Sequence, residues 1–206
     1  MHGSFLFSVC YNKVSRKIFW RKSMKVLAVL GSPHKNGPTT TITKELLRGA
    51  KEAGHEIVEY YVDDMLIKGC KACGYCKEHM VDCIIKDDMI PYWKDFHECG
   101  ALIVSSPNYC AQITGPMLTF MNRHYCMLKM RPEGNIVRVH PGIKLVGIFS
   151  QGVADPNRYI ENYKWYLSDF ENKDMLLQDI LVHTSAMSYE PGSEIMLRAY
   201  ELGKSL

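Results

Sequence analysis

The sequence lacks the glycine patterns of the best-known nucleotide sites. No G-x-G-x-x-G run is present, which argues against a dinucleotide site, and no glycine-rich loop ends in Gly-Lys-Ser or Gly-Lys-Thr, which argues against an ATP-type loop. No Ser/His/Asp set or pair of carboxylates stands out, so we assign no catalytic residue. Every apolar run is too short to span a bilayer, and we expect no membrane partner.

Acidic residues are absent from the first part of the chain. The basic residues of residues 1–23 are Lys13, Arg16, Lys17, Arg21 and Lys22. That leaves 20 of the 25 basic residues against all 22 acidic ones in residues 24–206, so we expect no nucleic-acid partner. In residues 1–23 an apolar patch precedes the charges, the reverse of a signal peptide. We interpret residues 1–23 as a disordered leader or a misassigned start, and residues 24–206 as one domain.

Short apolar runs alternate with helical patterns along residues 24–206. The expected strands are residues 25–30, 56–62, 101–105, 144–149 and 179–183. The expected helices are one that Gly54 closes, residues 89–98, one from residue 116, residues 157–170 and residues 194–203. Residues 63–86 and 131–142 are expected to be irregular. Strands that alternate with helices predict an α/β fold with a doubly wound parallel sheet of five strands.

The segment Gly31–Thr41, directly after the first strand, has the composition of a phosphate-binding loop. Gly31 and Gly37 let the backbone approach an anion, and several hydroxyl groups can donate hydrogen bonds to it. The following helix adds free N–H groups and a partial positive charge at its start. The segment therefore predicts a mononucleotide site. The alternative is a hydroxyl-rich helix cap without a ligand.

The same segment resembles the FMN-phosphate loop of the NADPH-dependent FMN reductase and iron-sulfur flavoprotein group in the flavodoxin-like superfamily. That loop has the pattern Gly-Ser-Pro-Arg-x-x-(Gly/Ser)-Asn-Thr, which Gly31, Ser32, Pro33, Gly37 and Thr39 match. His34 replaces the usual Arg and Pro38 replaces Asn, so we expect a weaker phosphate site. The resemblance implies strand order 2-1-3-4-5 and FMN as cofactor. It assigns FMN binding in this loop to Ser32, His34, Asn36, Gly37, Thr39 and Thr40.

Two further loops at the carboxyl ends of predicted strands complete the expected flavin site, because ligands of open parallel sheets bind there. Ser106-Pro107-Asn108-Tyr109 matches the family pattern Ser-Pro-x-Tyr, and Phe120-Met121-Asn122-Arg123 is similar to the family's Phe-Ile-Asp-Arg. Pro107, Tyr109 and Ala111 offer surface to a ring, and Asn108, Cys110 and Ala111 offer N–H groups. Topology and family position add Ser150, Gln151 and Gly152. The alternative is an ordinary proline turn.

Four of the eight cysteines form the run Cys70-x2-Cys73-x2-Cys76-x6-Cys83. Such close spacing suits a 4Fe-4S cluster better than a zinc ion, which usually takes two separated pairs. The iron-sulfur flavoproteins that the chain resembles carry such a cluster beside FMN. Zinc, free redox thiols and inert cysteines are the alternatives. Cys10, Cys99 and Cys126 lie outside this run and are interpreted as structural or incidental. Cysteines without an export signal indicate metal or redox use in the cytoplasm rather than disulfides.

These features predict an FMN-dependent oxidoreductase that passes electrons between an iron-sulfur cluster and FMN, with NAD(P)H or ferredoxin as donor. The alternatives are a cluster-free NAD(P)H-dependent FMN or quinone reductase, and a flavodoxin-like electron carrier without enzymatic activity. The expected partners are a small-molecule or protein donor and acceptor, and further copies of the chain in a dimer or tetramer. The aromatic residues 159–170 are a candidate contact surface. His124 and His183 are interpreted as core or surface histidines.

Overall fold

The computed structural model describes residues 23–130, 134, 136–138 and 141–206. Its main sheet has the parallel strands β2 (Glu56–Tyr61), β1 (Lys25–Leu30), β3 (Cys99–Tyr109), β7 (Lys144–Gln151) and β8 (Leu176–Thr184), in that spatial order. Counting only these parallel strands, the order is 2-1-3-4-5, which confirms the predicted flavodoxin-like sheet. The prediction for the leader concerns residues that, apart from Ser23, lie outside the described part.

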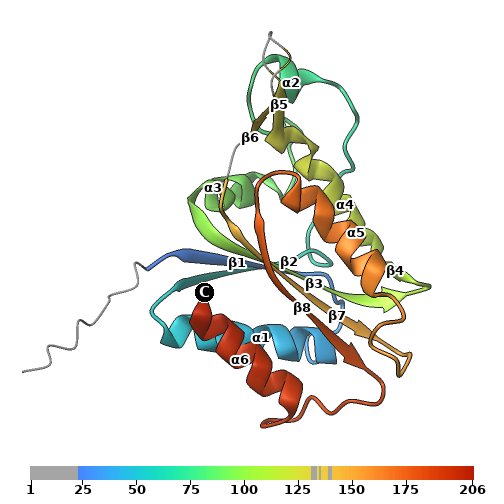
Figure 1. Cartoon of the computed structure of the whole chain (residues 1–206). Helices are drawn as coiled ribbons and strands as arrows, with labels where there is room; N and C mark the ends of the chain where they lie inside the picture. The colour runs from blue at the N-terminus through green and yellow to red at the C-terminus, as the bar shows by residue number, and fades with distance from the viewer. Residues whose placement is uncertain (1–22, 131–133, 135, 139–140) are drawn as a thin grey trace, which may run out of the picture.

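Helices cover both faces of this sheet (Figure 1). On one face lie α1 (Pro38–Glu52) and α6 (Glu194–Ser205), and on the other α3 (Ile90–Glu98), α4 (Gly115–Arg123) and α5 (Ile160–Glu171). Successive side chains of a strand point to opposite faces. The continuous apolar runs in β1, β3 and β7 therefore supply a buried core on each side of the sheet. No helix of the described part is long and apolar enough to cross a membrane.

Helices α1 and α6 touch at two glycines. A Cβ atom on Gly203 would lie 1.9 Å from the carbonyl oxygen of Leu46, and one on Gly49 would lie 2.1 Å from that of Tyr200. No side chain fits between these backbones. This contact fixes α1, and with it the loop between β1 and α1, against the sheet.

Several boundaries differ from the predicted ones. β3 continues to Tyr109 and pairs antiparallel with the short β4 (Gln112–Ile113), and β8 begins three residues earlier than expected, at Leu176. The irregular passage after β2 contains one helical turn, α2 (Tyr75–Glu78). The prediction of a loop over residues 131–142 is wrong in part, because β6 (Ile136–Arg138) pairs antiparallel with β5 (Leu128–Met130). This short hairpin was not predicted because the segment contains Pro132, Gly134 and Pro141, which are typical of loops.

His124 lies in the core, as the sequence analysis suggested. It follows α4, in a short 3-10 turn (His124–Met127), and is completely buried among aromatic rings. Its Nδ1 lies 3.1 Å from the carbonyl oxygen of Phe120 and its Nε2 lies 2.8 Å from the hydroxyl of Tyr92. A neutral ring fits both bonds, donating from Nδ1 and accepting at Nε2. Burial, helped by the nearby positive charges of Lys173 and Arg123, lowers the pKa of His124 to about 3.

We expect this histidine to make the protein less stable in acid. Between its ordinary pKa of 6.5 and about 3, the unfolded chain binds a proton that the folded protein excludes. The free energy of unfolding should therefore fall by about 1.4 kcal/mol per pH unit as pH drops through that window. Urea unfolding at several pH values measures this slope. The paired variant Y92F/H124F should flatten it, whereas H79Q, at an exposed histidine, should leave it unchanged.

Candidate functional site

A cavity of about 270 Å³ lies where the loops after the parallel strands meet. Its lining comes from the loop after β1, the end of β3, the end of β7 and the end of β8. The lining residues are Ser32, His34, Gly37, Pro38, Thr39, Pro107, Asn108, Tyr109, Ser150, Gln151, Gly152 and His183. The structure thus brings together the three loops that the sequence analysis assigned to one site.

Backbone contacts fix the first loop at its start. The Gly31 N–H donates to the carbonyl oxygen of Ser105, at 2.7 Å, and the Thr114 hydroxyl donates to the carbonyl oxygen of Gly31, at 2.9 Å. A Cβ atom on Gly31 would lie 2.9 Å from that same Ser105 oxygen, so only glycine fits here. These bonds hold the loop after β1 close against the end of β3.

The N-terminus of α1 faces this cavity without a cap of its own. Gly37 is the N-cap, no side chain caps the helix, and the first turn contains no acidic residue. Pro38 occupies the first turn, where a backbone N–H has no acceptor within the helix, so the N–H that proline lacks costs no helical hydrogen bond. The remaining free N–H groups and the helix dipole favour an anion beside Gly37 and Thr39.

The hydroxyl groups of the first loop have different partners. Thr39 Oγ1 lies 2.5 Å from Ser150 Oγ, which joins the first loop to the third. Ser32 Oγ accepts from the His34 N–H at 3.2 Å. Thr40 instead donates to the His34 carbonyl oxygen, at 3.1 Å. Thr40 and the exposed Asn36 do not line the cavity, although both were predicted site residues.

Cys110 and Ala111 form the turn between β3 and β4 and do not line the cavity either. Both have positive φ angles, 52° and 63°, as a two-residue turn of this hairpin requires. Cys110 lies on a neighbouring hollow of about 420 Å³ that also includes Pro33 and Asp63. Tyr109 lines both spaces and is half exposed, so its ring is available to a flat ligand.

A buried hydrogen-bond chain connects the second and third loops through α5. Asn108 Nδ2 donates to the Tyr163 hydroxyl at 3.0 Å, and that hydroxyl donates to Gln151 Oε1 at 2.8 Å. Gln151 Nε2 in turn donates to the carbonyl oxygen of Asp155, at 2.6 Å. The Tyr163 ring stacks on Phe149. The Gln151 amide therefore holds its own loop in place, and Tyr163, which the sequence analysis did not assign to the site, fixes both loops.

We expect Y163F to destabilise the protein. The change removes one hydroxyl and leaves the Asn108 and Gln151 amides without their buried partner, which costs about 1–3 kcal/mol. Urea unfolding at neutral pH measures the loss. Y166F, on the same helix and only partly buried, is the matched control and should change stability by less than about 0.5 kcal/mol. Equal effects of the two changes would contradict a special role for the Tyr163 hydroxyl.

His183, interpreted from the sequence as a core or surface histidine, is buried on β8 and also lines the cavity. It pairs in register with Ser150 across β7 and β8. Its Nε2 lies 3.0 Å from the carbonyl oxygen of Met187, which assigns the ring proton to Nε2 and makes Nδ1 an acceptor. Burial lowers the pKa of this histidine. The signal in the sequence was its position at the carboxyl end of the last strand, beside the third loop.

The four cysteines of the predicted cluster motif surround one small enclosed space. Its lining comprises Cys70, Lys71, Ala72, Cys73, Gly74, Cys76, Cys83, Ile84, Ile85, Tyr125 and Cys126. Gly74 and Ala72 have positive φ angles of 75° and 50°, which bend the backbone around this space. Cys126, which the sequence analysis interpreted as structural or incidental, is buried in the same pocket. Within the described ranges, no three His, Cys, Asp or Glu side chains are placed to hold one metal ion.

The segment that carries these cysteines is closed at its base. The Leu66 N–H donates to the Asp88 carboxylate at 2.8 Å, and the Lys68 N–H donates to the Asp87 carboxylate at 3.1 Å. Arg123, at the end of α4, donates to the Asp87 carboxylate and to the carbonyl oxygen of Lys68. We call residues 68–87 the cysteine loop. Figure 1 shows its helix α2 beside the β5–β6 hairpin, beyond the layer of α3, α4 and α5.

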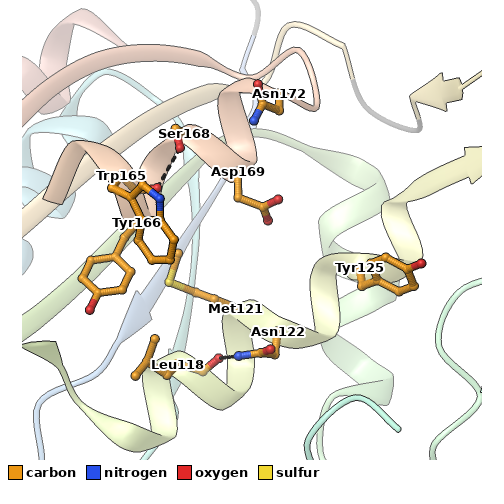
Figure 2. Close-up of a pocket in the computed structure, with 9 residues that line it drawn as sticks. All are labelled: Leu118, Met121, Asn122, Tyr125, Trp165, Tyr166, Ser168, Asp169 and Asn172. Carbon is orange, nitrogen blue, oxygen red and sulfur yellow. Dashed lines mark hydrogen bonds between the residues drawn. The ribbon is translucent and has the colours of Figure 1, made fainter. Parts of the chain in front are cut away.

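A groove of about 420 Å³ runs between α4 and α5 next to the cysteine loop. Figure 2 shows its lining residues, which are Leu118, Met121, Asn122, Tyr125, Trp165, Tyr166, Ser168, Asp169 and Asn172. Trp165 is 71% exposed, which is unusual for so large an apolar side chain. Tyr125 lines both this groove and the cysteine pocket.

The strand order and the cavity at the carboxyl ends of the strands define a flavodoxin-like α/β protein. Residues 24–143 match the NADPH-dependent FMN reductase family, and the chain belongs to this family.

Relatives and a solved structure agree with that assignment. An iron-sulfur flavoprotein of Methanocaldococcus jannaschii is 32% identical over 68% of this chain and 70% of its own. One of Archaeoglobus fulgidus is 31% identical over 58% of this chain and 56% of its own, so the chain spans little more than half of that relative. The azoreductase of Bacillus anthracis has the same fold, with a TM-score of 0.67, 14% identity, and coverage of 89% of this chain and 100% of its own.

Proposed function

We propose that the protein is an FMN-dependent oxidoreductase that binds FMN in the cavity after β1, β3 and β7 and holds a 4Fe-4S cluster in the cysteine loop. The observation that carries this proposal is the convergence of the three predicted loops on one cavity in a member of an FMN reductase family. The names of relatives at about 32% identity support the cluster.

The cavity has the parts that FMN requires. The uncapped start of α1 and the hydroxyls of Ser32 and Thr39 suit the phosphate. Pro107 and the half-exposed Tyr109 suit one face of the ring. Bound FMN would supply one- and two-electron redox chemistry. The chain's own contribution is to bind and orient that group and to hold the surrounding loops through Tyr163.

The cysteine pocket has the ligand set that a cluster requires. Cys70, Cys73 and Cys83 are free thiols, and Cys70, Cys73, Cys76 and Cys83 all face one space. Cluster thiolates bind different iron atoms and do not converge on one point. The pocket therefore fits a cluster although no three side chains of the described residues are placed for a single ion. Free thiols also support our assignment to the cytoplasm.

We further propose that the oxidoreductase acts with other copies of this chain. Cys70 and Cys73 are exposed, so a cluster there needs cover from water and oxidants. The groove beside them presents the exposed Trp165. No described residue lines both the cysteine pocket and the FMN cavity, which supports a neighbour's cavity as the electron partner. Sedimentation should give a dimer or tetramer that W165A weakens, while L197A on α6 has no effect.

Cofactor analysis after anaerobic purification tests the proposed function. We expect one FMN per chain, together with iron and acid-labile sulfide. FMN without iron would indicate a reductase that takes hydride directly from NAD(P)H, and steady-state NAD(P)H oxidation with a quinone or ferredoxin distinguishes an enzyme from an electron carrier. A folded protein that contains no flavin and does not bind added FMN would contradict the proposal.

A further inference from the structure

Arg123 is a buried cation at the point where α4 meets the cysteine loop. The residue is 1% exposed. Its Nη1 donates to the carboxylate of Asp87 and, at 2.8 Å, to the carbonyl oxygen of Lys68. Asp87 also accepts from the N–H groups of Lys68 and Met89, both at 3.1 Å. The carboxylate is therefore held by three donors, of which only one belongs to Arg123.

The other side of the guanidinium has donors to spare. Arg123 Nε and Nη2 are buried and have no hydrogen-bond acceptor among the described residues. The Cys83 thiol is a neighbour of the same guanidinium. Burial alone lowers the pKa of Arg123, but the hydrogen bond of Asp87 and the neighbouring Cys83 sulfur together keep that pKa above its ordinary value. Buried N–H groups without an acceptor, here one on Nε and two on Nη2, are costly inside a protein, so their presence in a side chain that neighbours Cys83 calls for an anionic partner.

We propose that Arg123 is a positioning residue that donates to the Cys83 thiolate and to the sulfur of the metal group it carries, and so stabilises negative charge there. This inference rests on the proposed cluster. One-electron reduction adds a negative charge to a cluster. A positive group with free donors beside one ligand stabilises the reduced form more than the oxidised form, which raises the reduction potential.

The need to close the base of the cysteine loop does not by itself explain why Arg123 is buried there. The Lys68 and Met89 N–H groups already anchor Asp87, and the ion pair uses a single edge of the guanidinium. A buried ion pair is on its own a weak source of stability. The ion pair leaves the Nε and Nη2 donors of Arg123 without an acceptor, in a side chain that neighbours Cys83.

Two substitutions on either side of the ion pair separate an electrostatic role from a structural one. R123K keeps a cation opposite Asp87 but removes the donors beside Cys83. D87N keeps those donors and removes the counter-charge. In an anaerobic redox titration of the full-length protein, followed by electron paramagnetic resonance, we expect the midpoint potential of the cluster to fall in R123K and rise in D87N. We expect a change of about tenfold in the reduction equilibrium, or about 59 mV for one electron.

Opposite shifts support the proposal, whereas shifts of the same sign, or cluster loss in both variants with no shift in the remainder, overturn it. If the anaerobic wild-type protein contains no iron or sulfide, the proposed cluster is wrong, and the role of Arg123 is overturned with it. A protein that carries the cluster but shows no opposite shifts overturns the role of Arg123 alone.

Discussion

Replacing any one of Cys70, Cys73, Cys76 and Cys83 by serine is expected to remove most of the iron and acid-labile sulfide from anaerobically purified protein. The four thiolates act as one ligand set, and a hydroxyl is a poor ligand for a cluster. Cys70 and Cys73 are exposed, so these two changes in particular should not disturb the fold. FMN content should remain, because the FMN cavity shares no described residue with the cysteine pocket.

Cys99 is the matched control for this series. It begins β3, does not line the cysteine pocket, and burial raises its pKa to about 12, so it stays a neutral thiol. C99S should keep its iron. Cys126 is unsuitable as a control because it is buried in the pocket with the other four cysteines. Stoichiometric zinc without sulfide in the wild-type protein, or unchanged iron in all four variants, would refute the cluster.

The double variant S32A/T39A is expected to lose most of its FMN affinity. Both hydroxyls line the cavity beside the uncapped start of α1, where the phosphate is proposed to bind. A hydrogen bond to a charged acceptor contributes about 1.5–3 kcal/mol. Loss of two such bonds should raise the dissociation constant by about two to four orders of magnitude. Titration of the flavin-free protein with FMN, followed by fluorescence, measures the change.

T41A is the control for that experiment. Thr41 carries the same hydroxyl one helical position beyond Thr40 but does not line the cavity, so its removal should leave FMN affinity unchanged. Thermal unfolding of S32A/T39A without FMN shows whether the variant is folded, since Thr39 also bonds Ser150. A folded double variant that binds FMN as tightly as the wild type would show that the phosphate lies elsewhere.

The sheet and the general place of the site followed from local features of the sequence. Lys25–Leu30 and Lys144–Phe149 are apolar runs, as strands buried on both faces must be, and the glycines and prolines after them mark the loops. Parallel strands bring their carboxyl ends to one edge, so the loops after residues 30, 105 and 149 were expected to meet. The family resemblance then supplied the cofactor that these loops suit.

Contacts between distant residues could not be predicted in this way. In the sequence, Tyr163 is one of several aromatic residues on a predicted helix. Only the structure shows that its hydroxyl bonds to Asn108 and Gln151. Cys126 is far from the cysteine run in the sequence, yet the turn after α4 places it in the same pocket. Thr40 and Asn36 were assigned from the family resemblance of the loop, which does not tell which side chains turn toward the cavity.

The closed base of the cysteine loop has a consequence for chain entropy. Lys68 and Asp87 are 19 positions apart, and joining the ends of so long a segment costs about 2.6 kcal/mol plus a constant. Hydrogen bonds at the base offset this entropic cost in the folded protein, without the help of a metal. The proposed cluster would therefore bind to a segment whose ends are already joined, and its loss would leave α4 and the sheet folded. We expect the cysteine loop to gain or lose such a cluster as a separate local unit, without unfolding of the whole domain.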